Sequence, residues 1–222
     1  MYKTNRPINE DKEFFGFKIR TRRRYNDEKI INQCLCRDPY RIPKNIKVVV
    51  DIGSNIGIVA LDCAKKGAEN IYAFEPSIEN FETLVYNVNI NGYQDKIHCI
   101  QKGVGIPNKN TKLYIHPKNA GATSSYLEQK GLTEDKYQEV EFISIYDVFK
   151  NYNIEHCNLL KMDCEGSERD IINDLDDNLA NKISQISVEF HNKPLIEGLI
   201  NKLSKWYKPE HLRRTEWVFY KI

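Results

Sequence analysis

Short apolar runs alternate with stretches of helix length from about Ile46 to the end of the sequence. The apolar runs predict core strands at residues 47–50, 70–74, 97–104, 157–162 and 183–190. Amphipathic stretches predict helices at 56–66, 78–89, 168–175 and 195–203. Because alternating strands and helices form parallel βαβ units, this order predicts an α/β protein. We expect an open, doubly wound, mostly parallel sheet with helices on both faces.

Three regions depart from this alternation. Residues 111–116 and 140–145 predict strands on either side of a polar loop at 119–129. Residues 217–220 predict a C-terminal edge strand, which we expect to be antiparallel. The first 45 residues lack the rhythm altogether, so we expect an N-terminal cap or extension at 1–45 and a single domain at 46–222.

The N-terminal segment carries a basic run close to aromatic residues. Arg20, Arg22, Arg23 and Arg24 follow a cluster of phenylalanines and precede Tyr25. The favoured interpretation is a helical or extended cap with a solvated charged face. The alternative is a lip that recognises an anionic acceptor.

Charge and composition narrow the function classes. The chain has 33 basic and 31 acidic residues among 222, a net charge of +2, so nothing global favours a nucleic-acid or membrane partner. No secretory signal or membrane span is visible, which predicts a cytoplasmic protein. The six cysteines are scattered, and we therefore expect free thiols.

The strongest local motif is a glycine turn after a buried strand, VVVDIGSNIG at residues 48–57. Gly53 allows backbone torsions that a side chain forbids, and Gly57 allows close packing of the following helix. The G-x-G-x-x-G spacing of dinucleotide sites is absent, so a ligand without phosphate is favoured over a pyrophosphate. S-adenosylmethionine (SAM) fits this turn, with Asp51 meeting its cationic end directly or through water. A strand–turn–helix without a ligand is the alternative.

An acidic residue follows the next predicted strand. Glu75 lies about 20 positions after the glycine turn, where a carboxylate can accept hydrogen bonds from both ribose hydroxyls. Pro76 ends the strand. This position predicts a ribose-binding acid, against the alternative of an exposed loop glutamate. We expect Ser54, Asn55, Pro76 and Val104, the last at the end of the third strand, to complete the cofactor site together with Asp163.

Two later strands also end in polar residues. Asp163 and Glu165 occupy alternate positions after one strand, and His191 follows the other. Clustered carboxylates have raised pKa values that suit proton removal from a hydroxyl, so these three residues are the candidate catalytic groups. His191 is either a base or a group that orients the acceptor. The same three side chains would hold a divalent metal only if they converge in space, so we assign no metal site.

Four blocks in this order resemble the FkbM family of SAM-dependent methyltransferases. They read VVVDIGSNIG, YAFEPSIENFETLVYNVNING, LLKMDCEGSE and ISVEFHN, within residues 47–192. The resemblance implies a Rossmann-like class I methyltransferase fold and methyl transfer to oxygen, on a sugar, glycan or natural-product-like small molecule. It also implies that Asp51, Gly53, Asn55 and Gly57 form the SAM turn, that Glu75 binds the ribose, and that Asp163 and Glu165 face the transferred methyl. Two alternatives remain, a SAM-binding module without turnover and a nicotinamide-dependent oxidoreductase.

Overall fold

The computed structural model describes residues 9–22, 25–107, 112–116, 123–127 and 132–222. Within these residues the main sheet has seven strands in the order β12-β13-β11-β10-β3-β4-β5. The strands are β3 (Val48–Ile52), β4 (Asn70–Phe74), β5 (Ile97–Ile100), β10 (Leu159–Met162), β11 (Gln185–Glu189), β12 (Tyr207–Arg213) and β13 (Glu216–Lys221). The five strands from β11 to β5 are parallel to one another, and β13 and β12 add antiparallel pairs beyond β11.

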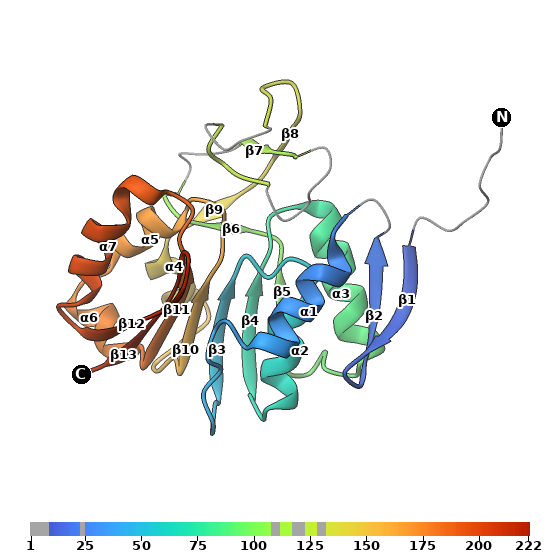
Figure 1. Ribbon diagram of the computed structural model, residues 1–222, viewed down its shortest axis with the longest axis horizontal. Helices are drawn as coiled ribbons and strands as arrows, with labels where there is room; N and C mark the ends of the chain where they lie inside the picture. The colour runs from blue at the N-terminus through green and yellow to red at the C-terminus, as the bar shows by residue number, and fades with distance from the viewer. Residues whose placement is uncertain (1–8, 23–24, 108–111, 117–122, 128–131) are drawn as a thin grey trace.

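Helices cover both faces of this sheet (Figure 1). One face packs on α1 (Asp27–Arg37), α2 (Ile58–Lys65) and α3 (Ile78–Ile90). The other packs on α4 (Ile145–Asn151), α5 (Glu168–Asp174), α6 (Asp177–Lys182) and α7 (Ile196–Leu203), which follows a short 3₁₀ helix, η2 (Lys193–Leu195). Successive residues of β3 belong to different cores, Val49 to the first and Val50 to the second, because side chains alternate across a strand. The predicted doubly wound fold is confirmed.

Two small sheets lie outside the main one. β6 (Gly103–Val104) pairs with β9 (Phe142–Ile143), and β7 (Lys112–Tyr114) pairs with β8 (Tyr137–Glu139). The predicted strand at 97–104 is therefore two strands, since β6 leaves the main sheet after β5. The predicted strand at 140–145 is also too long. Ser144 caps α4 there, exchanging hydrogen bonds with Asp147, and this capping box begins the helix at Ile145.

The C-terminal edge also differs from the prediction. β13 contains the predicted strand at 217–220 and is antiparallel as expected, but it lies inside the sheet. β12 forms the edge. The charged and polar residues of β12 hid it from the apolar pattern, because an edge strand faces solvent with much of its surface. Most of the predicted polar loop at 119–129 lies outside the described residues.

The N-terminal segment packs on the main fold. β1 (Asn9–Phe14) and β2 (Phe17–Arg22) form a hairpin, and Phe17, Ile19 and Ile31 join the same core cluster as α2 and α3. The expected solvated charged face is wrong for Arg22, which is buried in an ion pair with Asp27. Arg23 and Arg24 lie outside the described residues.

All six cysteines are free, as expected. No helix among the described residues is long and apolar enough to cross a bilayer.

Candidate functional site

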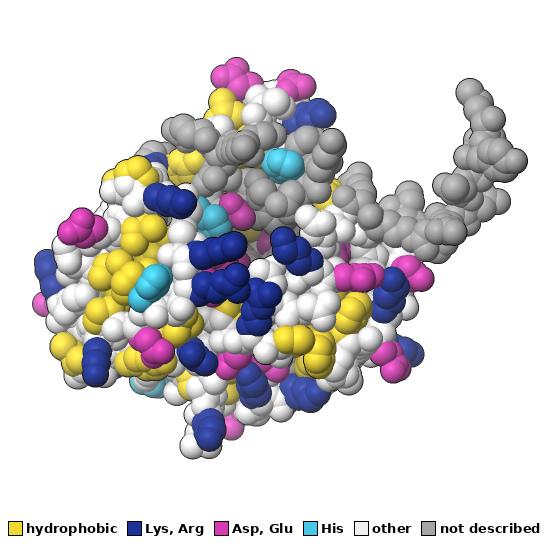
Figure 2. Space-filling model, viewed as in Figure 1, with side chains coloured by type: hydrophobic (Ala, Val, Ile, Leu, Met, Phe, Trp, Pro, Cys, Tyr) yellow, Lys and Arg dark blue, Asp and Glu magenta, His cyan; other side chains and the backbone are white. Residues whose placement is uncertain are grey.

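A cavity lies at the carboxyl ends of β3, β4, β10 and β11, where parallel sheets usually bind ligands. Helix α1 forms its outer wall, and the exposed side chains Lys29 and Arg37 of α1 belong to its lining. The inner lining is acidic, with Glu75, Asp163, Glu165, Glu189 and Glu216. Figure 2 shows Lys and Arg side chains gathered around a hollow on this face, with acidic side chains visible within it.

The glycine turn is held against two neighbouring strands. The backbone N–H groups of Gly53 and Ser54 both donate to the Phe74 carbonyl at 3.0 Å. Gly53 has φ +75°, and a Cβ there would overlap the Asp163 carbonyl. Gly57 has φ +90°, and a Cβ there would lie 2.5 Å from a methyl group of Leu84 on α3. Both positions therefore favour glycine, and at Gly57 the restriction comes from α3.

Asp51 lies beneath the turn, paired with a lysine. Its side chain is fully buried and its Oδ1 is 2.9 Å from Lys161 Nζ on the adjacent strand β10. The same ammonium donates to the carbonyls of Gly53 (2.6 Å) and Ile52 (3.2 Å). Burial lowers the pKa of Lys161, but Asp51 and Asp163 outweigh it and hold the ammonium charged. Lys161 lines the cavity while Asp51 does not, so the direct contact between Asp51 and a ligand that the sequence suggested is not available in this geometry.

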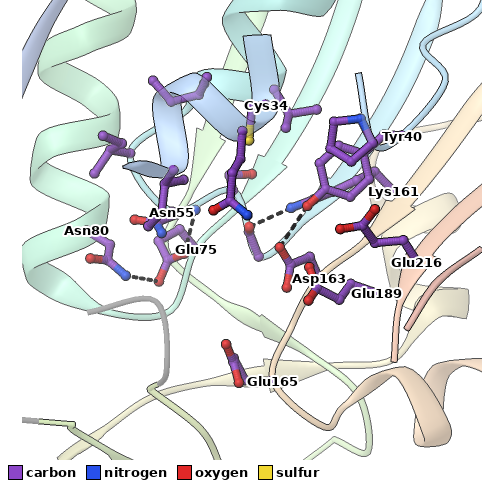
Figure 3. A pocket seen from close by; sticks show the side chains of 18 of the residues that line it. Cys34, Tyr40, Asn55, Glu75, Asn80, Lys161, Asp163, Glu165, Glu189 and Glu216 are labelled. Carbon is purple, nitrogen blue, oxygen red and sulfur yellow. Dashed lines mark hydrogen bonds between the residues drawn. The ribbon is translucent and has the colours of Figure 1, made fainter. Parts of the chain in front are cut away.

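Glu75 is buried at the end of β4 with its carboxylate in the cavity lining (Figure 3). Oε2 accepts from the Asn55 backbone N–H (2.8 Å), and Oε1 accepts from the Ser77 N–H (3.0 Å) and from Asn80 Nδ2 (3.2 Å). Burial raises the pKa of Glu75, although these donors oppose the rise. A carboxylate has about four acceptor positions, so capacity remains for a ligand hydroxyl.

Asp163, on the opposite wall, is held by Tyr40. The Tyr40 hydroxyl donates to Asp163 Oδ2 at 2.8 Å (Figure 3). The Tyr40 carbonyl in turn accepts from Ser187 Oγ (2.6 Å) and Gln185 Nε2 (3.1 Å) of β11. The aspartate orientation therefore depends on the segment that precedes β3.

His191 joins the remaining acids. Its Nδ1 is 2.9 Å from Glu168 Oε1, and its Nε2 is 3.7 Å from Asp163 and 3.6 Å from Glu165. Burial lowers the pKa of His191, but the hydrogen bond to Glu168 and the neighbouring carboxylates raise it to about 10. Burial raises the pKa of Glu165 to about 8. An imidazolium donates protons, so His191 suits the orienting role better than that of a base.

Glu168 accepts hydrogen bonds from the backbone in addition to its contact with His191. Its two oxygens accept from the N–H groups of Cys164 and Gly166, both at 2.9 Å, and fix the turn between β10 and α5. This turn places Glu165 at φ +52°.

Three potential metal ligands converge, but they are not the expected set. Asp163, Glu189 and His191 each offer an atom within 4.8 Å of the others. Burial raises the pKa of Glu189 to about 7. An imidazolium cannot ligate a metal, so these three residues would bind one only after His191 loses its proton.

Two further cavities adjoin the first. One shares Gly53 and is lined mainly by apolar residues, among them Phe74, Pro76 and Val104. The other shares His191 and is lined by Tyr126, Gly166, Arg169, Asn192, Lys193 and Pro194. The central cavity therefore shares Gly53 with the apolar cavity and His191 with the other.

The structure brings together most of the predicted site residues. The central cavity is lined by Gly53, Ser54, Asn55, Glu75, Asp163, Glu165 and His191, and the apolar cavity adds Pro76 and Val104. Asp51 and Gly57 line neither and support the turn from beneath. Sequence reasoning missed Tyr40, Asn80 and Lys161, and it assigned Arg22 to a solvated face or an acceptor lip. Only Lys161 carried a signal, as a lysine inside an otherwise apolar strand.

Comparisons with known proteins identify the family. The Methyltransferase FkbM domain matches residues 51–214. The chain is 28% identical to "Methyltransferase 1" of Beauveria bassiana over 171 residues, which cover 69% of this chain and 68% of that one. It is 25% identical to "Methyltransferase sdnD" of Sordaria araneosa over 196 residues, covering 74% and 75%.

Solved structures share the fold. A methyltransferase FkbM from Methylobacillus flagellatus superposes with a TM-score of 0.55 at 17% identity, over 86% of this chain and 47% of that one. The chain thus spans about half of that protein. A SAM-dependent methyltransferase from Agrobacterium tumefaciens gives 0.53 at 8% identity, over 99% and 72%. The Rossmann-like class I methyltransferase fold is confirmed, and the chain belongs to the Methyltransferase FkbM domain family, whose methyl donor is SAM.

Proposed function

We propose that this protein transfers a methyl group from SAM to a hydroxyl of a sugar, glycan or natural-product-like small molecule. One observation carries the proposal. A single cavity has the buried carboxylate of Glu75 on one wall and Asp163, Glu165 and His191 on the other. A ribose-binding acid and a proton-accepting group would then lie on either side of the reacting methyl.

The cavities fit the parts of SAM separately. Glu75 retains acceptor capacity for a ribose hydroxyl beside the Gly53 turn. The apolar cavity around Phe74, Pro76 and Val104 suits the adenine ring. The acidic inner lining of the central cavity suits the sulfonium and ammonium charges. SAM, when bound, supplies an electrophilic methyl group.

The residues opposite Glu75 would handle the acceptor proton. Glu165, with a pKa of about 8, is a stronger base than an ordinary carboxylate and takes the hydroxyl proton once it is ionised. His191, kept protonated by Glu168, donates a hydrogen bond that orients the acceptor oxygen. Asp163, fixed by Tyr40, orients the same group or serves as the base. Much of the acceleration would come from this positioning.

The acceptor would enter through the cavity that shares His191. Its wall includes the Tyr126 ring, with the Arg169 guanidinium 4.1 Å from the ring centroid, and the Asn192 amide. Aromatic faces and polar side chains of this kind bind hydroxylated rings. This location would bring an acceptor hydroxyl toward Glu165 and Asp163 from the side away from Glu75.

Calorimetry with SAM and three variants tests the cofactor assignment. Glu75→Ala should weaken SAM binding about 100-fold, because it removes the ribose acceptor and frees three donors. Asp163→Ala should lower turnover more than affinity. Glu82→Ala, on the exposed side of the same helix α3, is the matched control and should change neither. Unchanged SAM affinity in Glu75→Ala would show that the site assignment is wrong.

Labelled SAM and a panel of acceptors test the reaction. Label transfer to hydroxyl compounds supports the proposal, and transfer to RNA instead would contradict the expected acceptor class. SAM binding without transfer to any acceptor would favour a binding module. Tight NADH binding, detected by fluorescence, would favour an oxidoreductase.

A further inference from the structure

Arg22 is a buried arginine at the end of β2, in the segment that precedes the matched domain. Its side chain is 1% exposed, and its guanidinium pairs with the equally buried Asp27 at the start of α1. Arg22 Nε and Nη2 donate to the two oxygens of Asp27 at 3.0 and 2.9 Å, and the Arg22 backbone N–H adds a bond of 2.8 Å. The charge of Arg22 is therefore neutralised within the N-terminal segment itself.

The remaining donors of the guanidinium point to the nucleotide side of the site. Nη1 donates to Asn80 Oδ1 at 2.6 Å, and Nη2 is 3.5 Å from Asn55 Oδ1. Asn80 then donates to one oxygen of Glu75, and the Asn55 backbone donates to the other. Two hydrogen-bonded branches thus start at one guanidinium and end on both oxygens of Glu75.

The first branch fixes the orientation of an amide. A side-chain amide can rotate by half a turn and exchange its oxygen with its nitrogen. With Arg22 donating to Oδ1, Asn80 must present its NH₂ group to Glu75. Without Arg22, the rotated amide would place an oxygen against the carboxylate and push Glu75 away from its position.

We infer that Arg22 is a positioning residue for the ribose-binding carboxylate, acting through Asn80 and Asn55. The N-terminal segment is then part of the nucleoside site, although it lies outside the family match at residues 51–214. This inference rests on the proposed function, because it assumes that Glu75 binds a ribose diol. It predicts that the effect of Arg22 on affinity depends on the ribose hydroxyls.

The test is a thermodynamic cycle between protein variants and ligand hydroxyls. Calorimetry would compare S-adenosylhomocysteine with its 2′,3′-dideoxy analogue on the full chain. Arg22→Lys keeps a positive charge beside Asp27 but lacks the second arm that reaches the amides. We expect about tenfold weaker binding of S-adenosylhomocysteine and unchanged binding of the dideoxy analogue. Asn80→Ala, which leaves the Arg22–Asp27 pair intact, should show the same selective loss even if Arg22→Lys folds poorly.

Arg20→Lys is the matched control. Arg20 lies on the same strand, pairs with Asp11 at 2.9 Å on the surface and has no side-chain bond toward Glu75, so both affinities should stay unchanged. If Arg22→Lys and Asn80→Ala weaken both ligands equally, the role is only structural and the inference is wrong. If the native protein binds the two ligands equally well, Glu75 does not form hydrogen bonds with the ribose hydroxyls. That result overturns the ribose assignment and the inference with it.

Discussion

The two walls of the central cavity are built differently. On the wall that we assign to the cofactor (the cofactor wall), Glu75 is buried and accepts hydrogen bonds of 2.8 to 3.2 Å, and Asp51 is buried beneath the turn 2.9 Å from Lys161 Nζ. On the acceptor wall, Glu165 and Asp163 lie 3.6 and 3.7 Å from the His191 imidazole, and both are partly exposed. We therefore expect the first wall to be rigid before a ligand binds, whereas the second holds Glu165 and His191, whose pKa values are raised to about 8 and about 10.

A transferase must bind its cofactor and must also remove a proton from its acceptor, and the two walls differ as these two tasks do. A cofactor common to many enzymes is bound by one fixed geometry, which backbone hydrogen bonds and buried pairs supply. Proton removal from an acceptor needs a group whose pKa lies near the working pH, which burial beside other carboxylates supplies. Substitutions on the first wall should therefore act mainly on folding and affinity, and those on the second on pH dependence and rate.

The largest effect should come from Gly53→Ala. The new Cβ would overlap the Asp163 carbonyl in a backbone conformation that already disfavours side chains. We expect a loss of more than about 3 kcal/mol in the free energy of unfolding, measured by denaturant titration. Gly198→Ala in α7, where a Cβ meets nothing within 4 Å, is the control and should be neutral or stabilising by about 0.5–1 kcal/mol. Comparable stability of the two variants would contradict a rigid cofactor wall.

Lys161→Met should be nearly as damaging. It leaves the Asp51 carboxylate buried without a counter-charge, which costs about 3–5 kcal/mol. Adding Asp51→Asn removes that charge, so the double variant should recover much of the lost stability in thermal unfolding. A double variant less stable than Lys161→Met alone would show that the ion pair does not connect β3 with β10 energetically.

Glu165→Gln tests the acceptor wall through pH. The raised pKa of Glu165 means that the folded protein binds this proton more tightly than the unfolded chain. The contribution of Glu165 to stability is therefore fully present below about pH 4.5 and is lost as pH rises through about 8. Near pH 8.5 the glutamine variant should be about 1–3 kcal/mol more stable than the native protein, with no such gain at pH 4.5. Exposed Glu155→Gln should show no difference between the two conditions.

The pH dependence of turnover in the same variant tests whether Glu165 is the base. If Glu165 is the base, native turnover should rise through about pH 8, and Glu165→Gln should lose that rise. A rise that persists in the variant would show that Glu165 is not the base.

The smallest effect should come from Tyr40→Phe. It removes one hydrogen bond of 2.8 Å to Asp163 while the Tyr40 carbonyl keeps its bonds to β11. We expect the free energy of unfolding to fall by about 0.5–1.5 kcal/mol. Turnover should fall several-fold, and SAM affinity should stay unchanged. A fall in affinity alone would place Asp163 on the cofactor wall instead.

The sequence predicted the parts whose pattern is local. The apolar strands, the glycine turn and the acid after β4 each follow from a few neighbouring residues, and the structure assembles them at one edge. It could not reveal that Arg22 contacts Asn80 or that Tyr40 contacts Asp163, because these pairs are 58 and 123 positions apart in the chain. It also mistook the capped start of α4 for strand, since two apolar residues precede Ser144 in both interpretations.

Because α1 forms one wall of the cavity, a bound ligand should protect this helix from amide exchange and proteolysis. Because α1 lines the cavity and Arg22 connects its first turn to Glu75, a bound ligand and an ordered N-terminal segment stabilise each other. Amide exchange in α1 and proteolytic cleavage near it should therefore slow as ligand concentration rises. Susceptibility of the N-terminal segment to a protease would then depend on whether the site is occupied.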